Sequence, residues 1–325
     1  MDNSAINKVE NSAIKKVEIR VKKKVTLKEH IVYNKWLYIM LIPGVTYFLI
    51  FRFAPMWGLS IAFKDYSPYL GFSGSEWVGL EFFKDFFASP DFIRLLSNTL
   101  VLGVLKITIG FSFPIILALL LNELKNEIYK KCIQTAIYVP HFVSWTIVAS
   151  ISVILLTSDT GALTNLFSTI TGHQVNPLTE PGFFKPMIVV QGIWKESGYG
   201  TIIYLAALAS VDAEQYEAAI VDGAGRFRRV ISITLPAIKN TIVIMLILAC
   251  GAFLSTGFDQ IFLMTNSLNR TAADVFDTYV YQVGITQGAY SYATAVGLFK
   301  SVVGVILVLG SNMIAKKVDP DTGIY

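Results

Sequence analysis

Long apolar runs constrain this chain more than any other feature. Six of them are found, at approximately residues 36–62, 94–121, 132–157, 186–210, 237–258 and 291–315. About 20 apolar residues, folded as a helix that satisfies its own backbone groups, cross a hydrocarbon core roughly 30 Å thick. Only 15% of the residues are charged, against roughly 25% in an ordinary soluble domain. We therefore predict an all-α integral membrane protein with six transmembrane helices.

Prolines lie in or near several of these runs. The first run, which is longer than one span requires, contains Pro43 and Pro55, and Pro114 and Pro140 fall in or near the second and third. Proline removes a helical hydrogen bond and kinks or interrupts the helix. We expect the first run to be kinked, or to continue as a short helix beyond the bilayer.

Lys and Arg residues predict the orientation of the spans. They are frequent before residue 36, after the second run, between the fourth and fifth runs and after the sixth, and sparse in the intervening segments. Cytoplasmic loops carry the excess of positive charge in membrane proteins. A multi-pass protein with both termini in the cytoplasm is therefore expected, which agrees with an even number of spans.

Two polar tails flank the predicted membrane domain of residues 36–315. Residues 1–35 contain a tandem octapeptide repeat, NSAINKVE followed by NSAIKKVE, and residues 316–325 form a short C-terminal tail. We interpret the N-terminal tail as a solvated basic segment that helps to fix orientation. Binding of anionic membrane lipid through Lys22–Lys24 is the alternative.

The chain lacks the motifs of an enzyme or a nucleotide-binding engine. Cys132 and Cys250 show no paired spacing, the three histidines have no metal-ligand spacing, and no G-x-x-x-x-G-K-[ST] motif is present to bind ATP phosphates. No cofactor and no nucleic-acid partner is predicted for this chain. If transport is active, the energy must come from another protein.

The loop between the fourth and fifth runs, residues 211–236, is longer than a helical hairpin requires. Its first part favours a helix, Asp222-Gly223 is a turn signal, and apolar periodicity resumes after Arg226. Glu217 offers a carboxylate to a partner, and the small side chains of Ala218 and Ala219 allow a close approach. The loop is predicted to be a cytoplasmic helix–turn–helix that docks onto another protein.

The same loop carries a family resemblance. The pattern E-A-A, three residues, G, nine residues, I-x-L-P is present as Glu217-Ala218-Ala219, Gly223, Ile233 and Leu235-Pro236. It resembles the signature of permease subunits of binding-protein-dependent ABC importers, a family of the bacterial cytoplasmic membrane. The resemblance implies that this segment, with Asp222 in its turn, is a coupling helix that seats in a cleft of the ATPase.

Other stretches are similar to the carbohydrate-uptake branch of that family, including its permeases for oligosaccharides and polysaccharides. They are Ala62–Tyr66, Asn98–Leu100, Ala118–Glu123, Pro140–Trp145, Asp277–Tyr281 and Gly323–Tyr325. The resemblance implies a carbohydrate solute, a second related permease subunit, an extracytoplasmic solute-binding protein, and two ATPase subunits that use ATP and Mg²⁺. The identity, length and charge of the sugar stay open.

Charged residues at membrane depth are candidates for the solute pathway, because such residues usually face a protein interior or an aqueous cavity. They are Arg52, Lys106, Lys195, Glu196 and Lys300. The strongest candidate surface runs from Trp194 to Tyr199, where aromatic and polar groups suit the two faces of a sugar. A structural role, or for Lys106 and Lys300 pairing with the partner subunit's carboxylates or snorkelling, is the alternative.

Two other functions are compatible with a membrane protein of this kind. A secondary transporter would need internal repeats and midplane carboxylates that bind ions, and Glu196 is the clear acid within the runs. A membrane-embedded enzyme would need converging catalytic groups, which the loops do not supply. The outward segment around Trp77 to Phe92 is interpreted as an amphipathic helix, either anchored in the bilayer interface and packed on the spans or in contact with the solute-binding protein.

Overall fold

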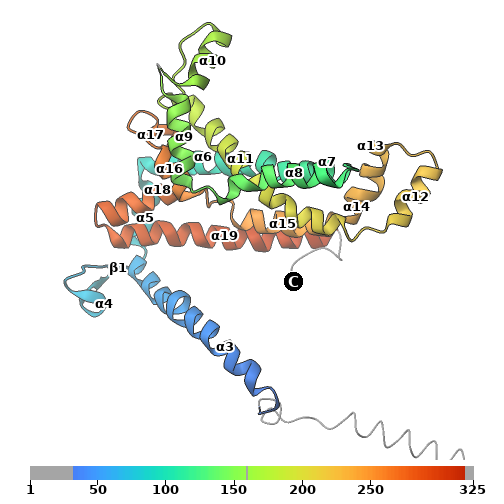
Figure 1. Cartoon of the computed structure of the whole chain (residues 1–325). Helices are drawn as coiled ribbons and strands as arrows, with labels where there is room; N and C mark the ends of the chain where they lie inside the picture. Colours follow the sequence, from blue (N-terminus) through green and yellow to red (C-terminus); the bar gives the residue numbers. More distant parts are fainter. Residues whose placement is uncertain (1–31, 159, 319–325) are drawn as a thin grey trace, which may run out of the picture. The chain divides into compact units, whose positions relative to one another are not determined.

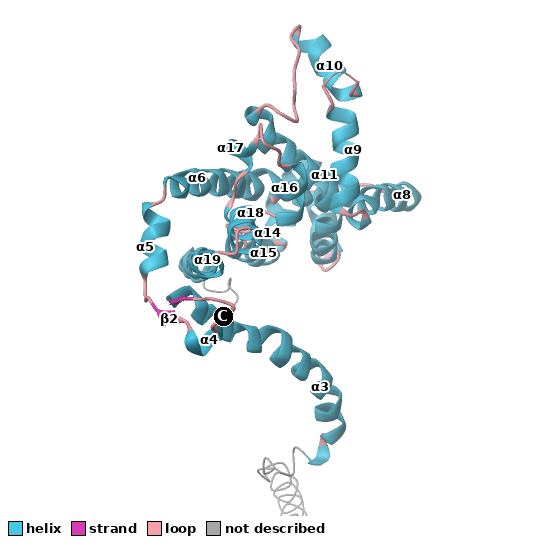
Figure 2. Ribbon diagram, turned by 90° about the vertical axis from the view of Figure 1, so that its left-hand side faces the viewer, coloured by secondary structure: helices cyan, strands magenta, loops and turns pink. Residues whose placement is uncertain are grey.

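The computed structural model describes residues 32–158 and 160–318, and most of them are helical (Figures 1 and 2). The chain divides into two compact units, residues 1–59 and 60–325. The predicted all-α fold class is therefore confirmed for the described residues. The N-terminal repeat and Gly323–Tyr325 lie outside the described residues.

The first unit holds most of the first predicted span. Helix α3 (Lys35–Phe48) is followed by the π-helical turn η1 (Leu49–Phe53) and the 3-10 helix η2 (Ala54–Phe63), which runs past the end of the unit. These elements together form a helix of 29 residues. The change of helix type before Pro55 fits the expected distortion, and no residue of α3 is buried within the chain.

Three long helices organise the second unit. Helix α6 (Pro90–Leu105) continues through the π-helical turn η3 (Lys106–Gly110) into α7 (Ser112–Asn122), which packs along α11 (Pro181–Leu208). The C-terminal helix α19 (Tyr290–Val318) lies beside α15 (Lys239–Gly251) and α18 (Phe276–Tyr281), as Figure 1 shows.

The third predicted span, residues 132–157, is not one helix. Helix α8 (Glu127–Tyr138) and the 3-10 turn η4 (Val139–Phe142) meet α9 (Trp145–Leu156) at a bend of 98°. Pro140 lies at the break, and the Ser144 hydroxyl caps α9 by accepting a hydrogen bond from the Ile147 amide. The continuous apolar run concealed this interruption.

The fifth predicted span, residues 237–258, was also too long. Helix α15 ends at Gly251, and the chain is not helical again until α16 (Phe258–Met264). Gly257, with φ +88°, adopts a conformation that disfavours other residues and accounts for the break. At its N-terminal end, α15 meets the helical segment Arg226–Ala237 at a bend of 65°.

The number of spans stays a prediction. By length and composition, three continuous helices within residues 32–158 and 160–318 can cross a membrane, and the two bent pairs raise the number to five. Helix α11 has 28 residues, which is long enough, but it contains Lys185, Lys195 and Glu196 and is not among the five. A sixth span therefore requires α11 to cross the bilayer surrounded by other helices, so that its charged residues do not face lipid.

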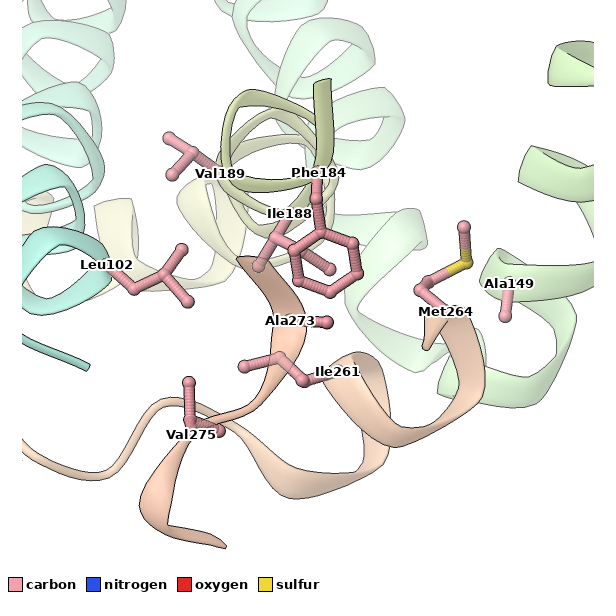
Figure 3. Close-up of a cluster of buried hydrophobic side chains, with 9 residues drawn as sticks. All are labelled: Leu102, Ala149, Phe184, Ile188, Val189, Ile261, Met264, Ala273 and Val275. Carbon is pink, nitrogen blue, oxygen red and sulfur yellow. The ribbon is translucent and has the colours of Figure 1, made fainter. Parts of the chain in front are cut away.

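The buried core joins elements that are distant in sequence. Figure 3 shows one cluster, in which Phe184 and Ile188 of α11 lie near Leu102 of α6 and Ile261 of α16. In a second cluster, the fully buried Phe86 of α5 (Glu81–Ala88) lies 5.6 Å, between ring centroids, from Phe299 of α19. The predicted amphipathic aromatic helix thus packs on a span.

Short elements connect the long helices. They include β1 (Lys64–Asp65), β2 (Glu76–Trp77), α4 (Gly71–Gly74), α10 (Ala162–Thr171), α17 (Arg270–Ala273) and η6 (Gln282–Thr286). Strands β1 and β2 form an antiparallel hairpin outside the predicted spans.

Candidate functional site

A helix–turn–helix occupies the predicted docking loop, which projects beyond α11 and α15 in Figure 1. Its elements are α12 (Ala213–Val221), α13 (Arg226–Arg229), the π-helical turn η5 (Val230–Thr234) and α14 (Leu235–Ala237). Asp212 caps α12 by accepting a hydrogen bond of 3.0 Å from the Glu214 amide. Gly223, with φ +77°, forms the turn that follows α12.

Two side-chain contacts hold the loop in place. The hydroxyl groups of Tyr216 and Thr234 lie 3.0 Å apart and join α12 to η5. Arg226 Nε lies 4.0 Å from an oxygen of Glu123, at the end of α7. The loop is therefore attached both to the entry of α15 and to α7.

The eight predicted docking residues have two kinds of environment. Ala219, Ile233 and Leu235 are half-buried inside the loop, whereas the others are exposed: Glu217, Ala218, Asp222, Gly223 and Pro236. Beside them, Val221 is 87% exposed and Phe227 is 79% exposed. Apolar side chains that project from a polar loop are typical of a protein-binding surface.

On α11, the predicted pathway residues separate into different faces. Trp194 lines an apolar cavity of about 550 Å³ between α9, α10 and α11, together with Val148 and Phe167. Lys195 is buried, whereas the side chains of Glu196 and Tyr199 are about half exposed. The predicted surface from Trp194 to Tyr199 is thus not a single surface.

Lys195 stabilises the break between α8 and α9. Its ammonium donates a hydrogen bond of 2.6 Å to the His141 carbonyl and lies 5.4 Å from the centre of the Trp145 ring. The last carbonyls of a helical segment have no partner within it, so a lysine from α11 supplies one. This geometry favours the structural alternative for Lys195.

The exposed face beside Lys195 combines an acid, an imidazole and an aromatic ring. One Glu196 carboxylate oxygen lies 2.8 Å from His141 Nδ1, and the other lies 3.3 Å from Lys195 Nζ. The His141 ring stacks on Tyr199, with 4.0 Å between centroids and 5° between planes. A carboxylate next to an aromatic face is suited to binding a sugar's hydroxyls and its apolar face. His141 was not among the predicted site residues, although it lies in the quoted segment Pro140–Trp145.

A second polar group surrounds the broken helix after α15. Lys106 donates a hydrogen bond to the Thr256 carbonyl, and the Thr256 amide donates one of 3.2 Å to an Asp277 oxygen. The other Asp277 oxygen forms an ion pair with Lys300. Lys300 is therefore neutralised within this chain. Asp277 is an acid that the sequence analysis did not select, because it lies outside the apolar runs.

Arg52 is the remaining predicted pathway residue. It lies in η1, in the first unit, and is exposed. Throughout residues 32–158 and 160–318, no group of three or more His, Cys, Asp or Glu side chains is arranged to hold a metal ion.

Comparison with known proteins places these features in context. The model of the family described as "Binding-protein-dependent transport system inner membrane component" matches residues 110–320. Protein LplB of Bacillus subtilis (strain 168) is 65% identical over 288 residues, covering 89% of this chain and 91% of that protein. The polygalacturonan/rhamnogalacturonan transport system permease protein YteP of the same organism is 52% identical over 295 residues, with coverages of 91% and 92%.

A solved structure is similar over most of the chain. It is a crystal structure of a bacterial alginate ABC transporter in complex with a periplasmic protein that carries an alginate pentasaccharide. One of its chains is 40% identical and superposes with a TM-score of 0.83, covering 92% of this chain and 99% of that chain.

Proposed function

The chain belongs to the family of binding-protein-dependent transport system inner membrane components, and on this premise we propose that it is the membrane permease subunit of an ATP-driven importer for a carbohydrate oligomer. It is a transport subunit and not an enzyme. The observation that carries the proposal is the 52% identity, over 91% of the chain, to a permease named for polygalacturonan and rhamnogalacturonan. The similar structure of an alginate transporter supports the same class of solute.

The importer would contain four further proteins. We expect a second related permease, two ATPase subunits that use ATP and Mg²⁺, and an extracytoplasmic solute-binding protein. Purification of the chain together with these partners tests the assembly. ATPase activity that rises when the loaded binding protein is added supports the proposal, whereas carbohydrate uptake by this chain without an ATPase would favour a secondary transporter.

Energy would enter through the loop of residues 211–236. In the proposed mechanism, the exposed residues Glu217, Ala218, Asp222 and Gly223 seat in a cleft of the ATPase, while Ile233, Leu235 and Pro236 connect the docked helix to α15. ATP binding closes the ATPase pair and moves the docked loops, and the two permeases alternate between inward-open and outward-open states. The nucleotide and the loaded binding protein must each favour the outward-open state, because a ligand shifts an equilibrium only by its differential affinity.

The proposed topology has six spans, with both termini and the docking loop in the cytoplasm of a bacterial cell. In a variant without Cys132 and Cys250, Thr169→Cys in α10 should react with a membrane-impermeant maleimide on intact cells. Gln215→Cys in α12 should react only after the membrane is opened. Labelling of Gln215→Cys on intact cells would contradict the orientation and the docking role together.

The face of α11 that holds Glu196 and Tyr199 is proposed to line the solute pathway. Tyr199→Ala removes a ring on which a sugar can stack, and Glu196→Gln removes a charged acceptor. Each variant is expected to lower the uptake rate about tenfold, as the loss of one such contact would, while the amount of assembled complex stays unchanged. Trp194→Phe, in the apolar cavity, is the matched control. Unchanged uptake by both pathway variants would remove this face from the pathway.

A further inference from the structure

Lys106 lies where two spans lose their regular helical structure. It begins the π-helical turn η3, and such turns inside α-helices are frequent at functional sites. Its ammonium donates to the Thr256 carbonyl, in the non-helical segment between α15 and α16. Non-helical backbone at membrane depth occurs only where it is buried in protein or lines a water-filled cavity. Lys106 is partly exposed, which favours the second case.

The acids near Lys106 already have partners. Asp277 and Glu196 both act on its charge through space. Asp277, however, is paired with Lys300 and with the Thr256 amide, and Glu196 contacts both His141 and Lys195. Within residues 32–158 and 160–318, no ion pair of Lys106 itself is found. Its hydrogen bond goes to a neutral group, the Thr256 carbonyl.

Two further features lie beside Lys106. The Thr256 hydroxyl is buried and has no hydrogen-bond partner among the described residues. Gly257 lies beside the ammonium, since a Cβ atom there would be 3.5 Å from Lys106 Nζ, an ordinary contact distance. A buried hydroxyl without a partner and, among the described residues, a cation without an ion pair together favour an anionic ligand.

We propose that Lys106 binds a carboxylate of the transported solute, and that it makes the pathway prefer oligosaccharides of uronic acids over neutral ones. This inference rests on the proposed function of the chain as a carbohydrate permease. A lysine held at membrane depth is costly and is therefore retained mainly where it serves a substrate path. The carboxylate of the solute would form the ion pair with the Lys106 ammonium.

The test measures binding to the complete importer in nanodiscs, without the soluble binding protein, so that the binding protein's own selectivity plays no part. The probes are a galacturonic acid trimer and its neutral methyl ester, titrated by calorimetry. The wild-type complex should bind the acid at least about tenfold more tightly, as one charge-assisted hydrogen bond would provide. Lys106→Met should remove this preference, and Lys106→Arg should retain it.

The control is the double variant Lys300→Met with Asp277→Asn, which removes a paired cation and its acid and should keep the preference. Retained preference in Lys106→Met would overturn the proposal. So would equal binding of the two probes, or binding of neither, by the wild-type complex. If the same importer, reconstituted in proteoliposomes with its binding protein, still took up a neutral oligosaccharide, the importer function would stand while the role of Lys106 fell.

Discussion

Glu217→Lys is expected to lower carbohydrate uptake by the assembled importer roughly a hundredfold or more, while the chain still inserts into the membrane. The Glu217 carboxylate is exposed, and no ion pair engages it among the described residues, so it is available to a partner arginine. Breaking a buried interfacial charge pair costs about 2–5 kcal/mol, since the remaining charge is left unpaired. The contacts that fold the loop, Asp212 with Glu214 and Tyr216 with Thr234, do not involve this side chain.

Gln215→Lys is the matched control for this prediction. It adds a positive charge to the same helix, but two residues away and therefore on roughly the opposite face. Uptake of labelled oligosaccharide and the amount of ATPase that co-purifies with the chain are the two measurements. Both should fall in Glu217→Lys and stay near the wild-type level in Gln215→Lys. Normal uptake by Glu217→Lys would rule out the docking role.

The backbone conformation of the turn in the same loop allows an independent test of the docking role. Gly223→Val places a side chain at φ +77°, whereas Gly225→Val does so at φ −65°, and neither position has another atom within 4 Å of a new Cβ. Left-handed backbone costs most residues about 1–2 kcal/mol, and β-branched residues adopt it very rarely. Loss of coupling in Gly223→Val but not in Gly225→Val is therefore the expected pattern.

Gly198→Ala is expected to destabilise the folded chain strongly, although it adds only one methyl group. A Cβ atom at Gly198 would lie 1.8 Å from the carbonyl oxygen of Ile137, so α11 and α8 could no longer pack as they do. Forcing extra volume into a packed core costs about 1–3 kcal/mol, and more where the obstacle is backbone. At an unfolding entropy of about 2.1 cal/mol/K per residue, a loss of about 3 kcal/mol should lower the melting temperature of this chain of 325 residues by roughly 4–5 °C.

Gly192→Ala is the matched control, because it makes the same change on the same helix with no atom within 4 Å of the new Cβ. Alanine favours helix over glycine by about 1 kcal/mol, so this variant should melt at or slightly above the wild-type temperature. The measurement is fluorescence-detected size-exclusion chromatography after heating in detergent. Equal melting temperatures for Gly198→Ala and wild type would contradict the close approach of α11 and α8.

The sequence was informative wherever the determining signal is local. Apolar runs identified the long helices α6–α7 and α19, and the turn signal at Asp222-Gly223 located the end of α12. The breaks within the third and fifth predicted spans were missed, because both runs are predominantly apolar and hydropathy does not distinguish a bent helix from a straight one. Only Pro140 and Gly257 indicated them, and neither residue by itself decides between a kink and a complete interruption.

In the candidate site, too, the residues with a local signal were identified and their tertiary contacts were missed. Glu196 and Lys106 were identified from charge at membrane depth, which is a local property. Their partners were not identified. The His141 carbonyl that receives Lys195, and the Asp277 that neutralises Lys300, are brought close only by tertiary packing across 54 and 23 residues of chain. Trp194 and Lys195 are adjacent, and one step along an α-helix turns the side chain by about 100°. The sequence therefore did not show which of the two faces the apolar cavity.

The hydrogen bond between Tyr216 and Thr234 has a mechanical consequence. It closes α12 onto η5 across the turn, and the Arg226–Glu123 contact fastens the same unit to the end of α7. A displacement of α12 is therefore expected to move η5 and the entry of α15 with it. The contact with Glu123 offers a second connection, from the same loop to the end of α7.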